Sequence, residues 1–215
     1  MPERTPPVRR LRTLAGLAVH PRRIPRRLRV RQRELQRRRL LAQLPKDAVC
    51  AEIGTWRGDF AASILDSRRP RLLHLVDPWE YRTEEGYERA IYGGRKGNGQ
   101  QMMDAVYERV LARFRGPIDG GQVLVHRSRS LDAAAAFDAE SLDWVYIDAD
   151  HSYEGVKNDL DAYFRTVKPG GFIAGDDYGQ VGSWFEDGVT RAVDEFAGRC
   201  EDMRVIGTQF LLKKP

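Results

Sequence analysis

From residue 47 onward, strand-like and helix-like segments alternate along the chain. The expected strands are "AVCAEIG", "RLLHLVDPW", "QVLVHR", "SLDWVYIDAD" and "GGFIAGDD", and "MRVIGTQFLLKK" adds strand-like residues at the end. Between them lie segments with helical spacing of apolar residues, such as "GDFAASILDS", "GQQMMDAVYERVLARF" and "YEGVKNDLDAYFRTV". This alternation is typical of an α/β fold, in which helices cover both faces of a mostly parallel sheet.

The net charge of +5 combines two segments of opposite sign. Residues 1–45 contain 14 arginines against only Glu3 and Glu34, a balance of +12, so the remaining residues carry −7. We therefore divide the chain into an arginine-rich arm, residues 1–45, and an acidic domain, residues 46–215. No proline or glycine occurs between Leu28 and Leu44, which predicts that the arm is partly helical.

The arm helix carries leucines that fall loosely on one side: Leu28, Leu35, Leu40, Leu41 and Leu44. We expect this side to dock on the domain or on a second subunit, in a homodimer or higher oligomer. The alternative is that the arginines bind phosphates of nucleic acid or lipid. No aromatic residue interleaves the arginines and no nucleic-acid motif is recognisable, so we expect no dedicated nucleic-acid partner.

Features that would place the chain in a membrane or an oxidising compartment are missing from the sequence. No apolar run reaches the roughly 18 residues of a membrane span. The stretch "LAGLAV" is too short for a secretory signal. Cys50 and Cys200 lie far apart without metal-ligand spacing, as expected for reduced thiols. We predict a cytoplasmic protein.

The first two expected strands end in residues suited to a nucleotide cofactor. In open α/β sheets, ligands bind beyond the carboxyl ends of the strands. Gly54 in "EIGTWRG" suits a sharp turn, and Gly58 suits close packing of the next helix. Asp77 ends the second strand 23 residues after Gly54, where a carboxylate holds the ribose of an adenosine-containing cofactor. The dinucleotide fingerprint is incomplete, which disfavours an NAD-dependent enzyme.

Two later strands end in carboxylates. Asp148 ends one, and Asp176 and Asp177 follow the next. Neighbouring strands lie roughly 4.8 Å apart, so these carboxylates would converge and repel one another unless a cation lay among them. Oxygen ligands favour Mg²⁺ first and Mn²⁺ or Ca²⁺ next. His151, three residues beyond Asp148, is the candidate general base for a hydroxyl that such an ion would activate.

Five motifs carry a family resemblance: "AEIGTWRG", "LVDPW", "HRSRS", "DWVYIDADHSYEG" and "KPGGFIAGDDY". In order and spacing they resemble class I S-adenosylmethionine-dependent methyltransferases. More narrowly, they are similar to the small metal-dependent O-methyltransferases that act on sugar hydroxyls in actinobacteria. The resemblance covers about residues 45–215 and leaves the arm outside. It implies a Rossmann-like, mostly parallel seven-stranded sheet, with S-adenosylmethionine and Mg²⁺ or Mn²⁺ as cofactors.

The resemblance also implies site residues. Those expected at the cofactor are Glu52, Gly54, Thr55, Trp56, Gly58, Asp77, Ser128, Ser130 and Asp148. Among them, Asp77 would hold the ribose, and Ser128 and Ser130 would flank the adenine. The expected metal ligands are Asp148, Asp176 and Asp177, and the expected catalytic base is His151. Aromatic candidates for contact with the acceptor are Trp79, Tyr153, Tyr178 and Trp184.

Residues 80–100 contain Gly93, Gly94, Gly97 and Gly99 and three tyrosines, which predicts a loop that could act as a lid over a ligand. The resemblance implies Mg²⁺-dependent methyl transfer from S-adenosylmethionine to a hydroxyl of a free sugar, an oligosaccharide such as a mannoside, or a glycosylated natural product. Catechols are the rival acceptors, although relatives that use them commonly have Asn in place of Asp177. A non-catalytic Rossmann-like module that binds polyanions through the arm is the alternative from another class. The intact carboxylates argue against it.

Overall fold

The computed structural model describes residues 26–83, 92, 99–182 and 185–215 of the 215-residue chain. The strands are β1 (Val49–Ile53), β2 (Leu72–Asp77), β3 (Val123–Arg127), β4 (Leu142–Ile147), β5 (Val167–Gly175), β6 (Asp202–Ile206) and β7 (Gln209–Lys213). The α-helices are α1 (Arg26–Leu41), α2 (Asp59–Arg68), α3 (Gly99–Arg113), α4 (Arg115–Asp119), α5 (Ser130–Ala136), α6 (Tyr153–Thr166) and α7 (Gly188–Phe196), and a 3₁₀ turn, η3, spans Ala197–Arg199.

The strands form one seven-stranded sheet in the order β3-β2-β1-β4-β5-β7-β6. The first five strands pair in parallel, whereas β7 runs antiparallel to both β5 and β6. The predicted α/β fold and the mostly parallel seven-stranded sheet are therefore confirmed. From β1 the chain adds strands first toward β3 and then, from β4 onward, on the other side. The strand order thus reverses between β1 and β4, where ligands bind in open α/β sheets.

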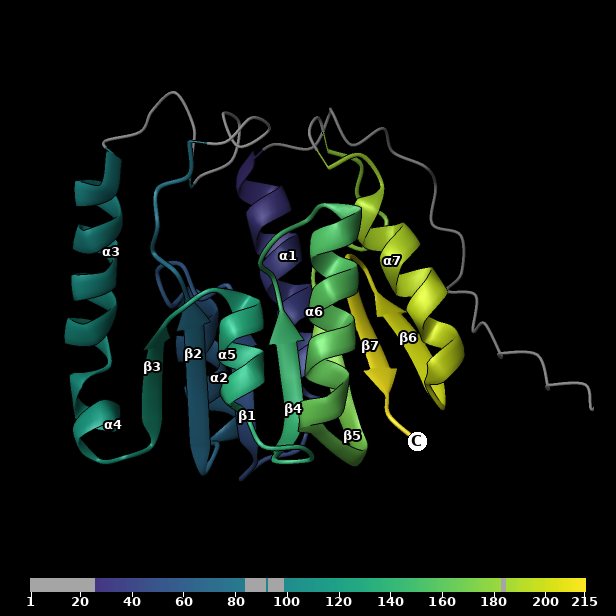
Figure 1. Cartoon of the computed structure of the whole chain (residues 1–215), viewed down its shortest axis with the longest axis horizontal. Coiled ribbons are helices and arrows are strands. Elements are labelled where there is room, and N and C mark those ends of the chain that lie inside the picture. The colour runs from purple at the N-terminus through teal and green to yellow at the C-terminus, as the bar shows by residue number, and fades with distance from the viewer. Residues whose placement is uncertain (1–25, 84–91, 93–98, 183–184) are drawn as a thin grey trace, which may run out of the picture.

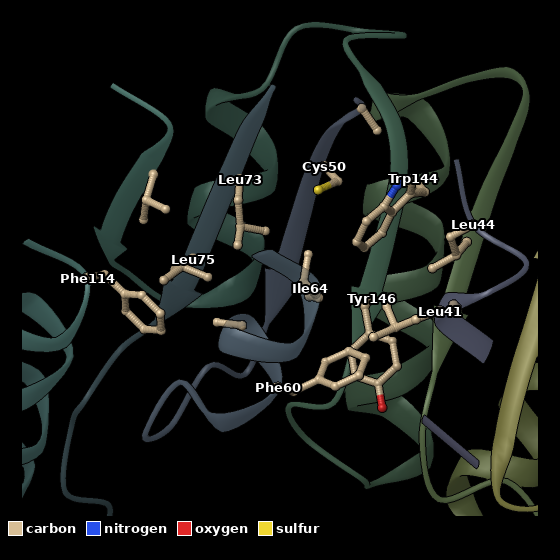
Figure 2. Packing of buried hydrophobic residues seen from close by; sticks show 14 of the residues in the cluster. Leu41, Leu44, Cys50, Phe60, Ile64, Leu73, Leu75, Phe114, Trp144 and Tyr146 are labelled. Atoms are coloured by element: carbon tan, nitrogen blue, oxygen red, sulfur yellow. The ribbon is translucent and has the colours of Figure 1, made fainter. Parts of the chain in front are cut away.

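Helices cover both faces of the sheet, because its central strands are apolar on both sides. One buried cluster joins α2 and α3 to the sheet, and the other joins α5, α6 and α7 to the opposite face. Figure 1 shows α5, α6 and α7 in front of the sheet. In the first cluster, Phe60 and Ile64 of α2 lie with Leu41, Trp144 and Tyr146 (Figure 2).

The predicted helix of the arm is α1, and it packs against α2, β6 and β7. Its end is docked as expected, since Leu40, Leu41 and the following Leu44 are at most 3% exposed. Leu28 and Leu35 are 54% and 49% exposed, so the domain covers them only in part, and docking of this side on a second subunit stays a prediction.

Two further sequence predictions concern the environment of the protein. Within the described ranges, no helix combines the length and the apolar character needed to cross a membrane. Cys50 is buried and Cys200 is partly exposed, and both are free thiols. Burial raises the pKa of each thiol, to about 11 at Cys200, so neither is activated as a nucleophile.

Candidate active site

The turn after β1 packs directly against the end of β4. Gly54 has φ +90°, and a Cβ atom there would lie 2.0 Å from the carbonyl oxygen of Asp148. The amide of Asp148 donates to the carbonyl of Ile53 at 2.8 Å, which fixes the two strand ends side by side. Glycine is required at position 54 for both reasons, the positive φ and the missing side chain. The turn and Asp148 therefore form one rigid unit.

Asp77 lies beside this turn, at the end of β2. Its buried carboxylate accepts hydrogen bonds from the amides of Trp56 and Trp79, each at 2.8 Å. The Tyr92 hydroxyl donates to Asp77 Oδ2 at 2.5 Å. Burial raises the pKa of the Asp77 carboxyl, and these hydrogen bonds oppose that rise. The structure thus brings Asp77 and the β1 turn together.

Tyr92 was not among the predicted site residues. Its hydroxyl uses an Asp77 oxygen, and its ring lies 5.3 Å from the ring of Trp56. The tyrosines of the glycine-containing segment were a signal for a ligand-contacting loop, but they did not single out Tyr92. The rest of that predicted lid, residues 84–91 and 93–98, lies outside the described residues.

Glu52 projects from β1 into the interior and is 2% exposed. Its Oε2 atom has no hydrogen-bond partner in the part of the chain that the structure describes. Burial raises the pKa of this carboxyl well above its usual range. A buried acceptor without a partner calls for a donor from outside the chain. The amino group of a methionine-derived cofactor would supply one, so the residues present fit S-adenosylmethionine.

The other predicted cofactor residues take different positions. Thr55 is buried in the turn, and the amide of Ser128 donates to the carbonyl of Asp77 at 3.1 Å. Gly58 precedes α2 with φ +73°, and a Cβ there would lie 2.4 Å from the Phe114 ring, so this glycine permits close packing near α3. The Ser130 hydroxyl donates to Asp159 of α6 at 2.5 Å and is directed toward that helix.

The acid cluster, which we define as Asp148, Asp176 and Asp177, forms where β4 and β5 end as neighbours. His151 Nε2 lies 3.2 Å from Asp148 Oδ1 and 3.5 Å from Asp177 Oδ2. Asp148, His151 and Asp177 each offer one ligand atom, and these three atoms lie within 4.8 Å of one another. Carboxylate oxygens are the ligands that Mg²⁺ and Mn²⁺ prefer, so Asp148 and Asp177 fit the expected metal, with the His151 imidazole beside them.

Asp176 is oriented differently from the other two carboxylates. Its Oδ1 accepts hydrogen bonds from the amide of Asp177 at 2.8 Å and from the Thr208 hydroxyl at 2.7 Å. Its side chain is fully buried. The structure thus places His151, rather than Asp176, in the group of converging ligand atoms.

Two arginines of α1 reach into the acid cluster, which the sequence analysis did not foresee. Arg37 Nη2 lies 2.6 Å from Asp148 Oδ2 and 3.0 Å from Asp176 Oδ2. Arg33 Nε lies 2.7 Å from Asp176 Oδ2, and its Nη2 lies 3.1 Å from Asp177 Oδ1. Residues four apart share one side of a helix, so this spacing was an available signal. However, the arm contains 14 arginines, and the sequence alone did not show that Arg33 and Arg37 are the two that reach the acids.

These charges shift the pKa values of the cluster. Burial alone would raise the pKa of Asp148, but its hydrogen bond to His151 and the charges of Arg37 and Arg33 lower it to about 2. Burial raises the pKa of Asp177, and Arg33 opposes that rise. Burial would lower the pKa of His151, but the bond to Asp148 and the carboxylate charges raise it. The carboxylate of Asp148 therefore favours the protonated form of the His151 imidazole.

The segment that carries His151 is fixed by local hydrogen bonds. The Ser152 amide donates to Asp150 Oδ1 at 2.8 Å, and the Ser152 hydroxyl accepts from the amide of Gly155 at 3.1 Å. Ser152 is thereby the N-cap of α6. The ring of Phe185 meets the His151 ring edge-on at 5.2 Å. These contacts hold the imidazole against the acid cluster.

The aromatic residues predicted to contact the acceptor lie in different environments. Trp79 is fully buried and its indole donates to the carbonyl of Trp56 at 2.9 Å, so its assignment to the acceptor is corrected to a packing role. The hydroxyls of Tyr153 and Tyr178 donate to acidic side chains of α7 at 2.6 and 2.8 Å. Trp184 lies outside the described residues.

A protein-family profile described as a methyltransferase domain matches residues 51–178, more than half of the chain. The chain belongs to this methyltransferase family. The match includes the β1 turn, Asp77 and the whole acid cluster, and it ends before β6 and β7. With the seven-stranded fold described above, it identifies an S-adenosylmethionine-dependent methyltransferase.

Solved structures, among them two of methyltransferases, share this fold at low sequence identity. The O-methyltransferase NovP has a TM-score of 0.57 at 20% identity, covering 85% of this chain and 79% of that one. A protein from Corynebacterium glutamicum has a TM-score of 0.57 at 16% identity, covering 87% and 88%. The N-methyltransferase NodS from Bradyrhizobium japonicum has a TM-score of 0.52 at 13% identity, covering 87% and 96%. No curated protein matches the chain in sequence.

Proposed function

We propose that this methyltransferase transfers the methyl group of S-adenosylmethionine to a hydroxyl of a saccharide, with a divalent cation at the acid cluster. The convergence of His151 with Asp148 and Asp177 carries the proposal. The His151 imidazole, which can accept a proton, lies beside the carboxylates of Asp148 and Asp177. Asp148 follows β4, whose end packs on the turn at Gly54. The choice of a sugar hydroxyl follows the sequence resemblance.

The cofactor side would be formed by Glu52, Asp77 and the turn at Gly54. Glu52 Oε2 lacks a partner within the described residues and would accept a hydrogen bond from the amino group of the methionine part. Asp77 would accept hydrogen bonds from the ribose, in place of the one that Tyr92 now donates. Gly54 gives the turn its positive φ and lets the end of β4 pack against it.

On the acceptor side, His151 would remove the proton of the attacking hydroxyl. The oxygen then bonds to the methyl carbon while the carbon–sulfur bond breaks, and S-adenosylhomocysteine leaves. Asp148 orients the imidazole and stabilises its charged form after proton transfer. Asp148 and Asp177 would hold the cation, which, when bound, makes an acceptor hydroxyl more acidic.

A methyl-transfer screen would test this function. The full-length protein is incubated with radiolabelled S-adenosylmethionine and Mg²⁺, and with either free sugars and oligosaccharides or catechols. Incorporation into a saccharide that stops with EDTA is the expected result. Transfer to catechols alone would reject the sugar acceptor, and transfer that survives exhaustive chelation would reject the metal. Calorimetry with S-adenosylhomocysteine, with and without Mg²⁺, reports cofactor binding separately.

A further inference from the structure

The helix of the arm contributes side chains to the proposed metal site. Figure 1 shows α1 extending past the arrowhead of β4, where the acid cluster lies. Arg37 bridges Asp148 and Asp176, and its guanidinium also lies 5.0 Å from the centre of the Phe60 ring. Arg33 bridges Asp176 and Asp177. Both arginines therefore contact the cluster through two acids each.

The two guanidiniums change the charge balance of the site. Three ionised carboxylates close together repel one another, which is why a cation was predicted among them. Arginine stays protonated in proteins, so Arg33 and Arg37 already supply two positive charges. The acid cluster can therefore persist in the folded chain without a divalent ion.

The arginines also use the atoms that a metal would need. All six carboxylate oxygens of the acid cluster have a partner within the chain. Arg37 takes Asp148 Oδ2, and Arg33 contacts both oxygens of Asp177 at 3.1 Å. A cation bound by Asp148 and Asp177 would have to displace these guanidiniums or share oxygens with them, against the repulsion of like charges.

We propose that Arg33 and Arg37 compete with the divalent cation for Asp148 and Asp177, so that α1 sets the metal affinity of the site. This inference rests on the proposed metal site. Displacement of the two side chains would loosen the part of α1 that precedes Leu40, where Leu28 and Leu35 are 54% and 49% exposed. The buried end of the helix, at Leu40 and Leu41, would stay docked.

Binding of Mn²⁺, followed by electron paramagnetic resonance without substrate or cofactor, tests the competition. The variant is Arg33→Gln with Arg37→Gln, which keeps polar side chains and removes both charges. The matched control is Arg38→Gln with Arg39→Gln, which removes two exposed charges of the same helix. We expect the variant to bind Mn²⁺ at least about 10-fold more tightly than the unchanged protein, because Coulomb repulsion at a few ångströms is strong in a partly buried site. The control should stay within about threefold.

Equal Mn²⁺ affinity in the variant and the unchanged protein would overturn the competition while leaving the metal site in place. Weaker binding in the variant would overturn it too, since the arginines would then assist the metal. Failure of every form to bind Mn²⁺ would reject both the inference and the metal part of the proposed function, but not methyl transfer itself.

Hydrogen exchange on the unchanged protein gives a second test that needs no substitution. Saturating Mn²⁺ should speed amide exchange at residues 30–37 by about 10-fold or more, while residues near Leu41 keep their protection. Unchanged or slower exchange at residues 30–37 with Mn²⁺ bound would show that α1 stays in place and would contradict the proposal.

Discussion

Arg37 Nη2 lies 2.6 Å from Asp148 Oδ2, although 111 positions separate the two residues in the chain. The contact joins the arginine-rich arm to the end of β4, which also packs against the turn at Gly54. A change in the arm can therefore alter the chemistry of residues more than a hundred positions away.

Replacement of His151 by alanine should lower the turnover number by about 10²- to 10⁴-fold, the range for loss of a general base. Mn²⁺ affinity and S-adenosylhomocysteine affinity should change by less than about threefold, since the carboxylates and Glu52 remain. Initial rates and calorimetry measure both quantities. His126→Gln, which alters a histidine paired with His74 instead, is the control. Parallel loss of Mn²⁺ affinity in His151→Ala would make this residue a metal ligand rather than the base.

Replacement of Tyr92 by phenylalanine removes the hydroxyl that donates to Asp77 Oδ2. If the cofactor ribose takes that acceptor, binding no longer has to break an existing hydrogen bond to a carboxylate. We expect S-adenosylhomocysteine to bind about 3- to 10-fold more tightly, a fraction of the value of a charged hydrogen bond. Calorimetry measures the change, with Tyr107→Phe as the control. Weaker binding would show that the Tyr92 hydroxyl contacts the cofactor itself.

Asp159 on α6 should make stability depend on pH. Burial raises the pKa of its carboxyl from 3.8 to about 7, so the folded chain keeps a proton that the unfolded chain releases. This contribution to stability is complete below about pH 4 and is lost as pH rises through 7. Asp159→Asn removes the loss. Its melting temperature relative to the unchanged protein should therefore be several degrees higher at pH 8 than at pH 4.5. The same difference at both pH values would contradict the shift.

Two leucine substitutions compare the contributions to stability of a buried and an exposed leucine of α1. Leu41 is 1% exposed, and Leu41→Ala should lower the free energy of unfolding by about 2–5 kcal/mol. Leu35 is 49% exposed, and Leu35→Ala should change it by less than about 0.5 kcal/mol. Urea denaturation followed by circular dichroism gives both values. Similar effects from the two substitutions would show that α1 does not dock through its end alone.

The sheet and much of the site could be predicted because each depends on local pattern. Apolar runs marked the strands, and the residues that follow those runs were brought to one edge by parallel pairing. Parallel pairing alone therefore predicts that Gly54, Asp77 and Asp148 lie near one another. The neighbouring ends of β4 and β5 likewise brought Asp176 and Asp177 beside Asp148.

The contacts of Arg33 and Arg37 could not be predicted in the same way. They depend on where α1 lies, which is fixed by packing of its apolar end, and on which of 14 arginines then face the acids. Burial of Trp79 was also hidden, because the backbone there takes a left-handed turn with φ +41°. Local sequence does not report the direction in which such a turn sends a side chain.

The methyltransferase match spans residues 51–178, whereas Arg33 and Arg37 precede it. The matched segment therefore includes the three acids but not the two arginines that pair with them. Recombination that grafted this catalytic segment onto a different N-terminus would keep all three acids and lose both of their internal counter-ions. The arm and the acids are expected to be inherited together, and a lineage that sheds the arm should acquire new basic residues facing β4 and β5 or come to depend on metal for folding.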